Sequence, residues 1–296
     1  MTVKETISVW LKAARAPFLI VSFIPAVLGG IIAYYNGFFD WTIFILATVG
    51  IVMAHSAGDF VDDYFDYING NLGNKEQQFH DSPLISGKVT LRQVLIATII
   101  CLAIAAGIGV YLLFEIGMPV LYLMLAGTFI VLFYTSPPVR LNYRGLGETA
   151  LFFAFGPMIV VGVYYVLTGT ITWEPVFASL PLGIFTMNVG IVSNTFDYED
   201  DVKNGKRCIP VRFGQAFAVR LIIIGTVIAY LSIIAGVLLG FMPDWTLISM
   251  ATIPLAAGVI IKTNKYNDTS NYTSAMGMAI GLTTIMGLMI VGGYLI

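Results

Sequence analysis

Long apolar runs, separated by short polar segments, follow one another along the whole chain. A helix needs about 20 apolar residues to cross the roughly 30 Å of hydrocarbon in a bilayer. Runs of that length predict nine transmembrane helices, at residues 17–35, 42–60, 93–113, 118–136, 148–167, 175–195, 216–240, 246–262 and 274–295. We therefore expect an all-α polytopic membrane protein, with residues 1–296 in a single intramembrane domain.

The amino-acid composition supports a membrane protein. Of the 296 residues, 58% are hydrophobic and 11% are charged, far outside the usual range of soluble domains. The net charge of -2 carries no information about a nucleic-acid partner, and we expect none, because the basic residues are explained by membrane topology. No obligate protein partner is evident. Cys101 falls in an apolar run and Cys208 in a polar loop, so neither a disulfide framework nor a catalytic thiol is indicated.

The basic residues predict the orientation of the helices, because short cytoplasmic loops collect Lys and Arg. With nine helices and a cytoplasmic N-terminus, all 15 basic residues fall on one side of the membrane. Residues 1–16 include the amphipathic stretch VKETISVWLKAARAP, which is typical of a helix lying on the cytoplasmic interface, and no cleavable signal peptide is expected. We expect an integral protein of the cytoplasmic membrane.

Two long polar segments, 59–92 and 197–215, interrupt the apolar pattern four helices apart. Each begins with aspartates at the cytoplasmic end of a helix and continues into a loop with basic residues. This predicts two four-helix halves of like topology plus a ninth helix. We expect both segments to be active-site loops that face the cytoplasm.

The first polar segment opens with GDFVDDYFDYING. On a continuous helix Asp59, Asp63 and Asp66 follow the spacing i, i+4 and i+7 and share one face, whereas Asp62 is expected to point elsewhere. Like charges at this spacing repel, so the face requires a bound cation. Mg²⁺ takes oxygen ligands and completes its shell with substrate phosphates, which makes it the natural partner.

The second polar segment, SNTFDYEDDVKNGKR, repeats the pattern. Asp197 and Asp201 are again at i and i+4, Asn194 lies one turn earlier, and Glu199 and Asp200 are expected to face away. Two such clusters suit two Mg²⁺ ions that bridge a diphosphate. The alternative interpretation of each aspartate is a solvated helix end.

Basic residues near the two clusters are candidates to bind the phosphate oxygens that metal leaves uncovered. The candidates are Lys206, Arg207, Arg140, Arg144 and Lys88. For each one, the alternative is a charge that serves membrane orientation alone.

The segment DDYFD, Asp62 to Asp66, also matches the DDxxD motif with which soluble prenyl diphosphate synthases hold Mg²⁺ and a diphosphate. The match comes with a second aspartate cluster and a membrane. Together they point to an integral membrane enzyme that ionises a prenyl diphosphate.

On these motifs the chain resembles the UbiA superfamily of intramembrane prenyltransferases over its full length. The first family motif, NxxxD with a further Asp, corresponds to Asp59, Asp63 and Asp66, and the second, DxxxD, to Asp197 and Asp201. The chain departs from the pattern where Asp59 and Asp62 replace Asn and where Ser82 replaces Arg, which leaves Lys88 as a substitute phosphate ligand.

Within that family, YTSPPVRLNYRGLGE and GKRCIPVRFG look most like the 1,4-dihydroxy-2-naphthoate prenyltransferases of menaquinone synthesis. The resemblance implies Mg²⁺-dependent transfer of a prenyl chain to an aromatic, quinone-precursor acceptor with release of pyrophosphate. Acceptors such as 4-hydroxybenzoate, homogentisate or a glycerol phosphate ether stay open.

The expected catalytic residues are Asp63, Asp66, Asp197 and Asp201. They hold metal and diphosphate while the C1–O bond breaks, and Asp66 could take the acceptor proton. The substrate pocket is expected to contain Asn194, Tyr134, Tyr143, Tyr64 and Tyr198, and the ring faces of the four tyrosines are expected to attract the carbocation. The prenyl tail is expected to leave sideways into lipid.

His55 is expected to be a buried, hydrogen-bonded residue, and His80 lies in the loop.

Two rival classes remain at the level of sequence. A divalent-cation or proton-coupled transporter also carries acids in a membrane, but these acids sit at one membrane face beside basic residues. A phosphatidyl-type transferase also uses clustered Asp and Mg²⁺, but its Asp-Gly…Ala-Arg signature is absent.

Overall fold

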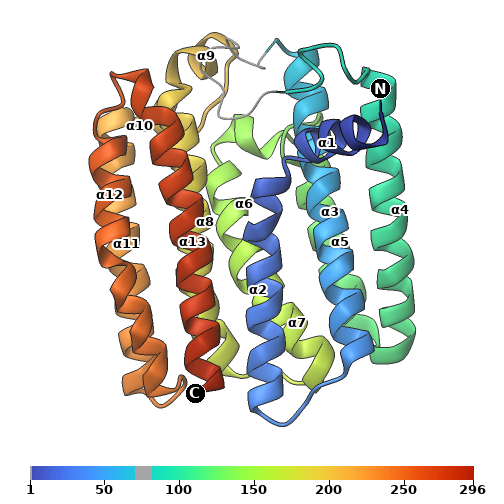
Figure 1. Ribbon diagram of the computed structural model, residues 1–296, viewed down its shortest axis with the longest axis vertical. Helices are drawn as coiled ribbons and strands as arrows, with labels where there is room; N and C mark the ends of the chain where they lie inside the picture. Colours follow the sequence, from blue (N-terminus) through green and yellow to red (C-terminus); the bar gives the residue numbers. More distant parts are fainter. Residues whose placement is uncertain (1, 71–81) are drawn as a thin grey trace.

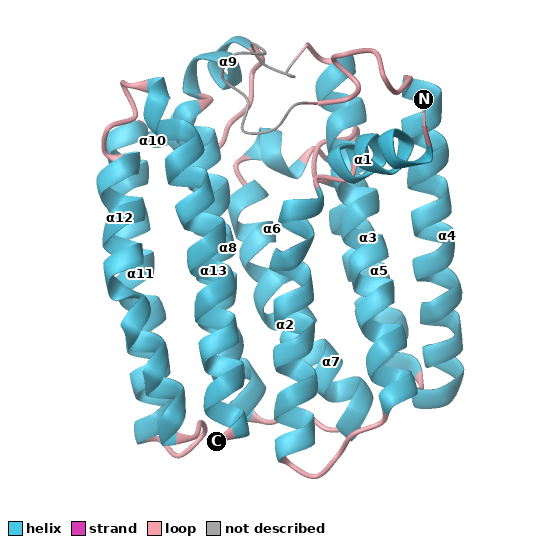
Figure 2. Cartoon of the chain, in the orientation of Figure 1, coloured by secondary structure: helices cyan, strands magenta, loops and turns pink. Residues whose placement is uncertain are grey.

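The computed structural model describes residues 2–70 and 82–296, and within these ranges the ordered elements are all helical. Figure 1 shows long helices standing side by side, with the N-terminus at one end of the bundle and the C-terminus at the other. Figure 2 shows that the loops and the short helices gather mainly at the end that carries α1 and α9. The prediction of an all-α polytopic membrane protein is confirmed.

Eight helical segments among the described residues are long and apolar enough to cross a membrane. They are Ala16–Tyr35 (α2), Trp41–Ile68 (α3), Leu91–Ile116 (α4), Gly147–Thr168 (α6 and α7), Trp173–Phe196 (α8), Gln215–Leu238 (α11), Asp244–Thr263 (ending in α12, Ile253–Thr263) and Thr269–Leu295 (containing α13, Tyr272–Leu295). A further apolar helix, α5, covers Met118–Phe133 with 16 residues.

Short polar signals fix where several helices begin. The Asp40 carboxylate accepts a hydrogen bond from the Ile43 amide at 2.9 Å at the start of α3. At the start of α4, Thr90 and Gln93 form a reciprocal capping box. These contacts satisfy amide groups that have no partner within the first helical turn.

The crossing formed by α6 (Gly147–Phe153) and α7 (Ile159–Thr168) is interrupted by one wide turn, Ala154–Met158, which contains Pro157. This turn lies against α8, where a Cβ built on Gly156 would come within 2.7 Å of the Gly183 Cα. Small residues therefore let the two backbones touch, as is common between membrane helices.

Helix α8 lies at the centre of the core and contacts α2, α6, α7, α11 and α13. Its side chains Leu182, Phe185 and Ile191 are almost completely buried. Because α8 is held on several sides, the polar residues at its carboxyl end occupy a firmly defined position.

The structure corrects three boundaries. Helix α3 continues to Ile68, so the first aspartate cluster lies on its last turns and not in a loop. The segment 197–215 contains two short helices, α9 (Tyr198–Lys203) and α10 (Ile209–Phe213). The expected interfacial helix is α1, Val3–Ala13, and it ends before Arg15, which has a φ of 46°. His80 and the middle of the 59–92 segment lie outside the described residues.

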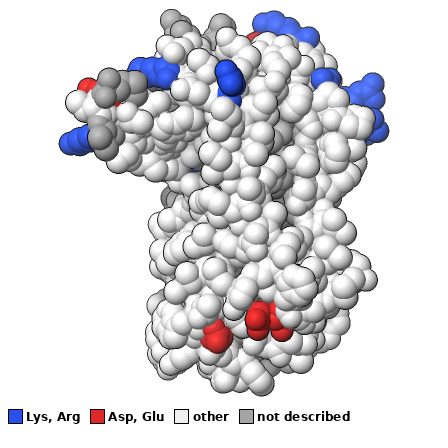
Figure 3. All heavy atoms as spheres, turned by 90° about the vertical axis from the view of Figure 1, so that its right-hand side faces the viewer, with Lys and Arg blue, Asp and Glu red and all other residues white. Residues whose placement is uncertain are grey.

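Charged side chains separate along the bundle axis. In the face shown in Figure 3, Lys and Arg gather at the end that carries α1, the opposite end shows acidic side chains and no Lys or Arg, and a broad uncharged belt separates the two ends. This is the distribution expected of a bundle embedded in a bilayer with its basic loops on one side.

Close packing of α2 against α7 depends on Gly29, because a Cβ at this position would overlap the carbonyl oxygen of Val160. We expect Gly29→Ala to lower the free energy of unfolding by about 1–3 kcal/mol, since two helix backbones would have to move apart. Thermal unfolding of the purified protein in detergent measures the change. The control is Gly281→Ala, where no atom lies within 4 Å of the new Cβ. Equal melting temperatures of the two variants would contradict this account of the packing.

Candidate active site

A cavity of about 510 Å³ opens among the helices and has one strongly polar end. Six carboxylates and two cationic side chains line that end: Asp59, Asp62, Asp66, Asp197, Asp200, Asp201, Arg15 and Lys206. They come from α3, from the α8–α9 junction, from the loop after α9 and from the α1–α2 break. The structure thus brings both predicted aspartate clusters together, although they are more than 100 residues apart in the chain.

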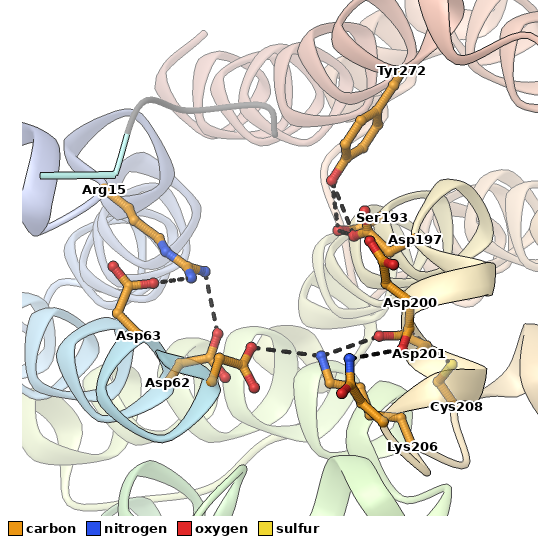
Figure 4. A network of polar contacts seen from close by, with 12 residues as sticks. Arg15, Asp62, Asp63, Ser193, Asp197, Asp200, Asp201, Lys206, Cys208 and Tyr272 are labelled. Atoms are coloured by element: carbon orange, nitrogen blue, oxygen red, sulfur yellow. Dashed lines mark hydrogen bonds and ion pairs between the residues drawn. The ribbon is translucent and has the colours of Figure 1, made fainter. Parts of the chain in front are cut away.

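Arg15 organises the first cluster. Its guanidinium forms an ion pair with Asp62 at 3.3 Å and a second ion pair with Asp63 (Figure 4). Burial disfavours the charge of Arg15, but the neighbouring carboxylates raise its pKa well above the usual value. Asp63 is buried against this arginine and does not line the cavity, whereas Asp62, which was expected to point elsewhere, does.

Helical spacing alone allows two sets of three aspartates to share a face of α3, because the middle member can be either Asp62 or Asp63. Asp59 and Asp66 share a face with a residue at i+3 as well as with one at i+4. Arg15 contacts both intermediate aspartates, and in the structure Asp62 lines the cavity whereas Asp63 is buried beside it.

The second cluster lies where α8 ends and α9 begins. Asp197 accepts hydrogen bonds from the Ser193 hydroxyl at 3.1 Å and the Tyr272 hydroxyl at 3.2 Å. Burial and the nearby Asp201 carboxylate raise the pKa of Asp197 to about 7. The expectation that Asp200 faces away is wrong: the helix breaks at Asp197, a single helical face does not continue across the break, and Asp200 lines the cavity. Glu199 is exposed, as expected.

Lys206 joins the two clusters. Its ammonium lies 3.5 Å from Asp66 on α3 and 3.3 Å from Asp201 on α9. Burial disfavours its charge, but these two carboxylates raise the pKa of Lys206 well above the usual value. Cys208 donates a hydrogen bond to Asp201 at 3.3 Å, and burial raises the pKa of its thiol. This agrees with the expectation that Cys208 is not a reactive thiolate.

The other predicted phosphate ligands lie away from the cavity wall. Arg207 and Lys88 are exposed. Arg144 is exposed and donates to the Pro138 carbonyl at 3.1 Å. Arg140 donates to Asn69 at 3.3 Å and stacks over the Tyr143 ring at 5.1 Å. Of the five candidates, only Lys206 lines the cavity.

The predicted pocket residues divide in a similar way. Tyr134 and Asn194 line the cavity. Tyr143 lies beside it, with its ring 6.0 Å from the Lys206 ammonium. Tyr64 packs against an apolar cluster beneath α1, and Tyr198 is half-buried outside the cavity lining. The expectation that Tyr64 and Tyr198 face the pocket is therefore wrong, because α3 and α9 turn these residues away.

A residue that sequence reasoning missed stands behind the polar wall. Glu148, at the start of α6, is 1% exposed and accepts hydrogen bonds from the Asn194 amide at 3.0 Å and the Ile209 backbone amide at 2.8 Å. It thereby orients Asn194 and anchors the chain just after Lys206. The only indication of Glu148 in the sequence was a single acidic residue at the end of the segment RGLGE.

His55 fits its expected structural role. Its Nδ1 lies 2.8 Å from the Ser22 hydroxyl, and its ring packs on Phe155 at 4.7 Å between centroids. Its other nitrogen lies 3.8 Å from Asp59.

The donor set suits a hard divalent cation bound together with a phosphate group. The Oδ2 atom of Asp59 and the Oδ1 atom of Asp62 are buried without a hydrogen-bond donor, which leaves both oxygens available as ligands. Within residues 2–70 and 82–296, no group of three or more His, Cys, Asp or Glu side chains is close enough to hold a metal by itself. Mg²⁺ commonly completes such partial shells with water and substrate phosphates.

Comparisons with known proteins agree with this geometry. The family model described as the UbiA prenyltransferase family matches residues 22–293. The chain is 27% identical to 2-carboxy-1,4-naphthoquinone phytyltransferase from Synechocystis, covering 99% of this chain and 95% of the relative. It is 22% identical to 1,4-dihydroxy-2-naphthoate octaprenyltransferase from Bacillus subtilis, covering 96% and 91%.

Solved structures share the fold. A UbiA homologue from Aeropyrum pernix superposes with a TM-score of 0.71 at 19% identity, covering 93% of this chain and 97% of that chain. A UbiA homologue from Archaeoglobus fulgidus, bound to DMAPP and Mg²⁺, superposes with a TM-score of 0.64 at 16% identity, covering 96% and 99%. With its helical fold, its two aspartate clusters and a family match over almost the whole chain, this protein belongs to the UbiA prenyltransferase family and is an integral membrane enzyme that transfers a prenyl chain from a prenyl diphosphate to an acceptor.

Proposed function

We propose that this enzyme transfers its prenyl chain to an aromatic quinone precursor, 1,4-dihydroxy-2-naphthoate in menaquinone synthesis, in a Mg²⁺-dependent reaction that releases pyrophosphate. The observation that carries the proposal is the polar end of the cavity, where six carboxylates face two cations above apolar walls. Such a site binds a diphosphate through metal and presents the attached hydrocarbon to a dry environment.

The naphthoate acceptor is supported by the relatives. The names of the Synechocystis and Bacillus subtilis proteins specify a naphthoquinone and a naphthoate substrate, and the chain covers more than nine-tenths of each. A glycerol phosphate ether and 4-hydroxybenzoate are the alternatives, and an acceptor panel distinguishes them.

We further propose nine membrane crossings with the N-terminus and the active site on the cytoplasmic side of the cell membrane. The two termini lie at opposite ends of the bundle, and this supports an odd number of crossings with α5 as the ninth. In the face shown in Figure 3, the Lys and Arg side chains lie at the end that carries α1, which supports this orientation by the positive-inside rule.

Two Mg²⁺ ions are proposed, one held by Asp59, Asp62 and Asp66 and the other by Asp197 and Asp201. When bound, the metal neutralises the diphosphate and lowers the energy of the departing pyrophosphate. We assign Asp63 to orienting Arg15, because its carboxylate is engaged by that guanidinium and lies off the cavity wall.

The protein side chains account for the remaining steps. As the C1–O bond breaks, its electron pair leaves with pyrophosphate, whose charge Lys206 and Arg15 offset. The apolar walls keep water from the allylic cation, and the ring face of Tyr134 attracts it. A ring carbon of the acceptor then bonds to C1, and the ring regains its aromaticity when that carbon loses its substituent, either a proton to a carboxylate of the site or a carboxyl group as CO2.

The direct test measures pyrophosphate release by the purified protein in lipid with geranylgeranyl diphosphate, Mg²⁺ and a panel of acceptors. We expect release that needs 1,4-dihydroxy-2-naphthoate and stops on addition of a chelator, because the carboxylates cannot hold the diphosphate without metal. Release with another acceptor alone would reassign the substrate. Release unaffected by the chelator would overturn the metal mechanism.

The two aspartate clusters are tested by Asp62→Asn and Asp197→Asn. Each change keeps the side-chain shape but removes a charged ligand, so we expect kcat to fall by at least about 100-fold. The matched control is Glu199→Gln, an exposed acid near the second cluster that should keep kcat within about twofold. Comparable losses in all three variants would remove the distinction between cavity and surface acids.

Lys206 and Arg207 offer a matched pair of adjacent cations, one buried in the site and one exposed. We expect Lys206→Met to lower kcat strongly and to lower the melting temperature, because Asp66 and Asp201 lose their shared partner. Arg207→Met should change neither quantity appreciably. Steady-state kinetics and thermal unfolding measure both, and a larger kinetic effect at Arg207 would show that the wrong cation has been assigned to the diphosphate.

A further inference from the structure

Two hydroxyl groups converge on one oxygen of Asp197 at the polar end of the cavity. Ser193 donates to Oδ2 at 3.1 Å, Tyr272 donates to the same Oδ2 at 3.2 Å, and the two hydroxyl oxygens lie 3.1 Å from each other (Figure 4). All three residues line the cavity. Because Oδ2 is engaged twice, Oδ1 is the oxygen that this carboxylate offers to a cation.

Packing fixes the direction of these two donors. Tyr272 is the first residue of α13 and is buried, and its ring stacks on Phe196 with 5.1 Å between centroids and 21° between planes. Ser193 lies in the last turn of α8, one helical turn before Asp197. The two hydroxyls therefore reach Asp197 from helices that are distant in the chain, since Tyr272 is 75 residues away from it.

The other aspartate of the second cluster is bound differently. At Asp201 the Lys206 ammonium lies 3.3 Å from Oδ1, and Cys208 donates to Oδ2, so the partners divide between the two oxygens and one of them is charged. At Asp197, by contrast, both donors are neutral hydroxyls and both use Oδ2. Asp197 therefore keeps its negative charge and presents it through the other oxygen.

The number of oxygens that a carboxylate gives to a metal helps to decide which metal fits. Ca²⁺ takes about six to eight oxygen ligands and readily accepts both oxygens of one carboxylate. Mg²⁺ requires a nearly ideal octahedron at about 2.0–2.1 Å. The two oxygens of one carboxylate lie too close together to fill two corners of that octahedron without distortion, so a carboxylate restricted to one oxygen suits Mg²⁺ better than Ca²⁺.

We propose that Tyr272 and Ser193 are positioning residues that restrict Asp197 to one metal-binding oxygen and thereby favour Mg²⁺ over Ca²⁺. The proposal rests on the proposed function, because it needs the second metal to be held at Asp197. The two hydroxyls act on the metal only through the carboxylate, as hydrogen-bond partners of metal ligands commonly do. Neutral donors suit this role, because they hold Oδ2 in place without cancelling the charge that Oδ1 presents.

Tyr272→Phe and Ser193→Ala each remove one donor without adding bulk. In the double variant Oδ2 loses both donors and can turn toward the metal, so Asp197 can bind Ca²⁺ through both oxygens. The matched control is Tyr230→Phe. The Tyr230 hydroxyl lies 2.8 Å from the Thr252 hydroxyl, and this residue is buried in the same apolar core as Tyr272 but does not line the cavity.

The experiment measures binding of an unreactive donor analogue, geranylgeranyl thiolo-diphosphate, to the purified protein in lipid, with Mg²⁺ or Ca²⁺ as the only divalent cation. The readout is the ratio of the two metal concentrations that give half-maximal binding. We expect the unmodified protein and Tyr230→Phe to need less Mg²⁺ than Ca²⁺. In the double variant the ratio should move toward Ca²⁺ by at least about tenfold, and each single variant should move it part of the way, because one donor remains. Since both metals are compared on the same variant, a general loss of stability cancels from the ratio.

The outcomes separate this inference from the proposed function. An unchanged ratio in the double variant would overturn the role of the two hydroxyls and leave the proposed reaction intact, and so would an equal shift in Tyr230→Phe. If the double variant does not fold, the two single variants decide the question in the same way. Analogue binding that needs no divalent cation, or no binding under any condition, would overturn the proposed metal mechanism and this inference with it.

Discussion

The structure depends on one electrostatic constraint: several carboxylates share a small volume at the membrane boundary, where water is scarce and like charges repel strongly. Arg15 and Lys206 are the two cations that line this end of the cavity, and each contacts two aspartates. Every chemical property of the site follows from that arrangement, because the excess negative charge favours divalent metal and the two cations favour phosphate.

The same contacts connect parts of the chain that are distant in sequence. Lys206 joins α3 to α9, and Arg15 ties the break between α1 and α2 to the end of α3. Glu148 adds a third connection from α6 to α8 and to the start of α10. The central position of α8 in the apolar core then holds this polar network in place against the bundle.

Much of the fold could be predicted from the sequence, because helix length and hydrophobicity are local properties that a bilayer imposes. The aspartate clusters were visible for the same reason, since their spacing on a helix is local. The predictions that were wrong concern the directions in which individual side chains point. Whether Asp62 or Asp63 faces the cavity depends on how α3 is rotated in the bundle, and whether Asp200 does so depends on a helix break at Asp197. Glu148 was missed because its partners are 46 and 61 residues away.

Helix α5 carries a consequence for the surrounding membrane. Its 16 residues measure about 24 Å, whereas the hydrocarbon of a typical bilayer is about 30 Å thick and the neighbouring α4 has 26 residues. Hydrophobic mismatch of this size is relieved by local thinning of the lipid or by oligomerisation. Helix α5 forms one wall of the cavity. A change in bilayer thickness therefore acts mechanically on that wall, and the lipid composition of the membrane becomes a physical variable that affects the active site.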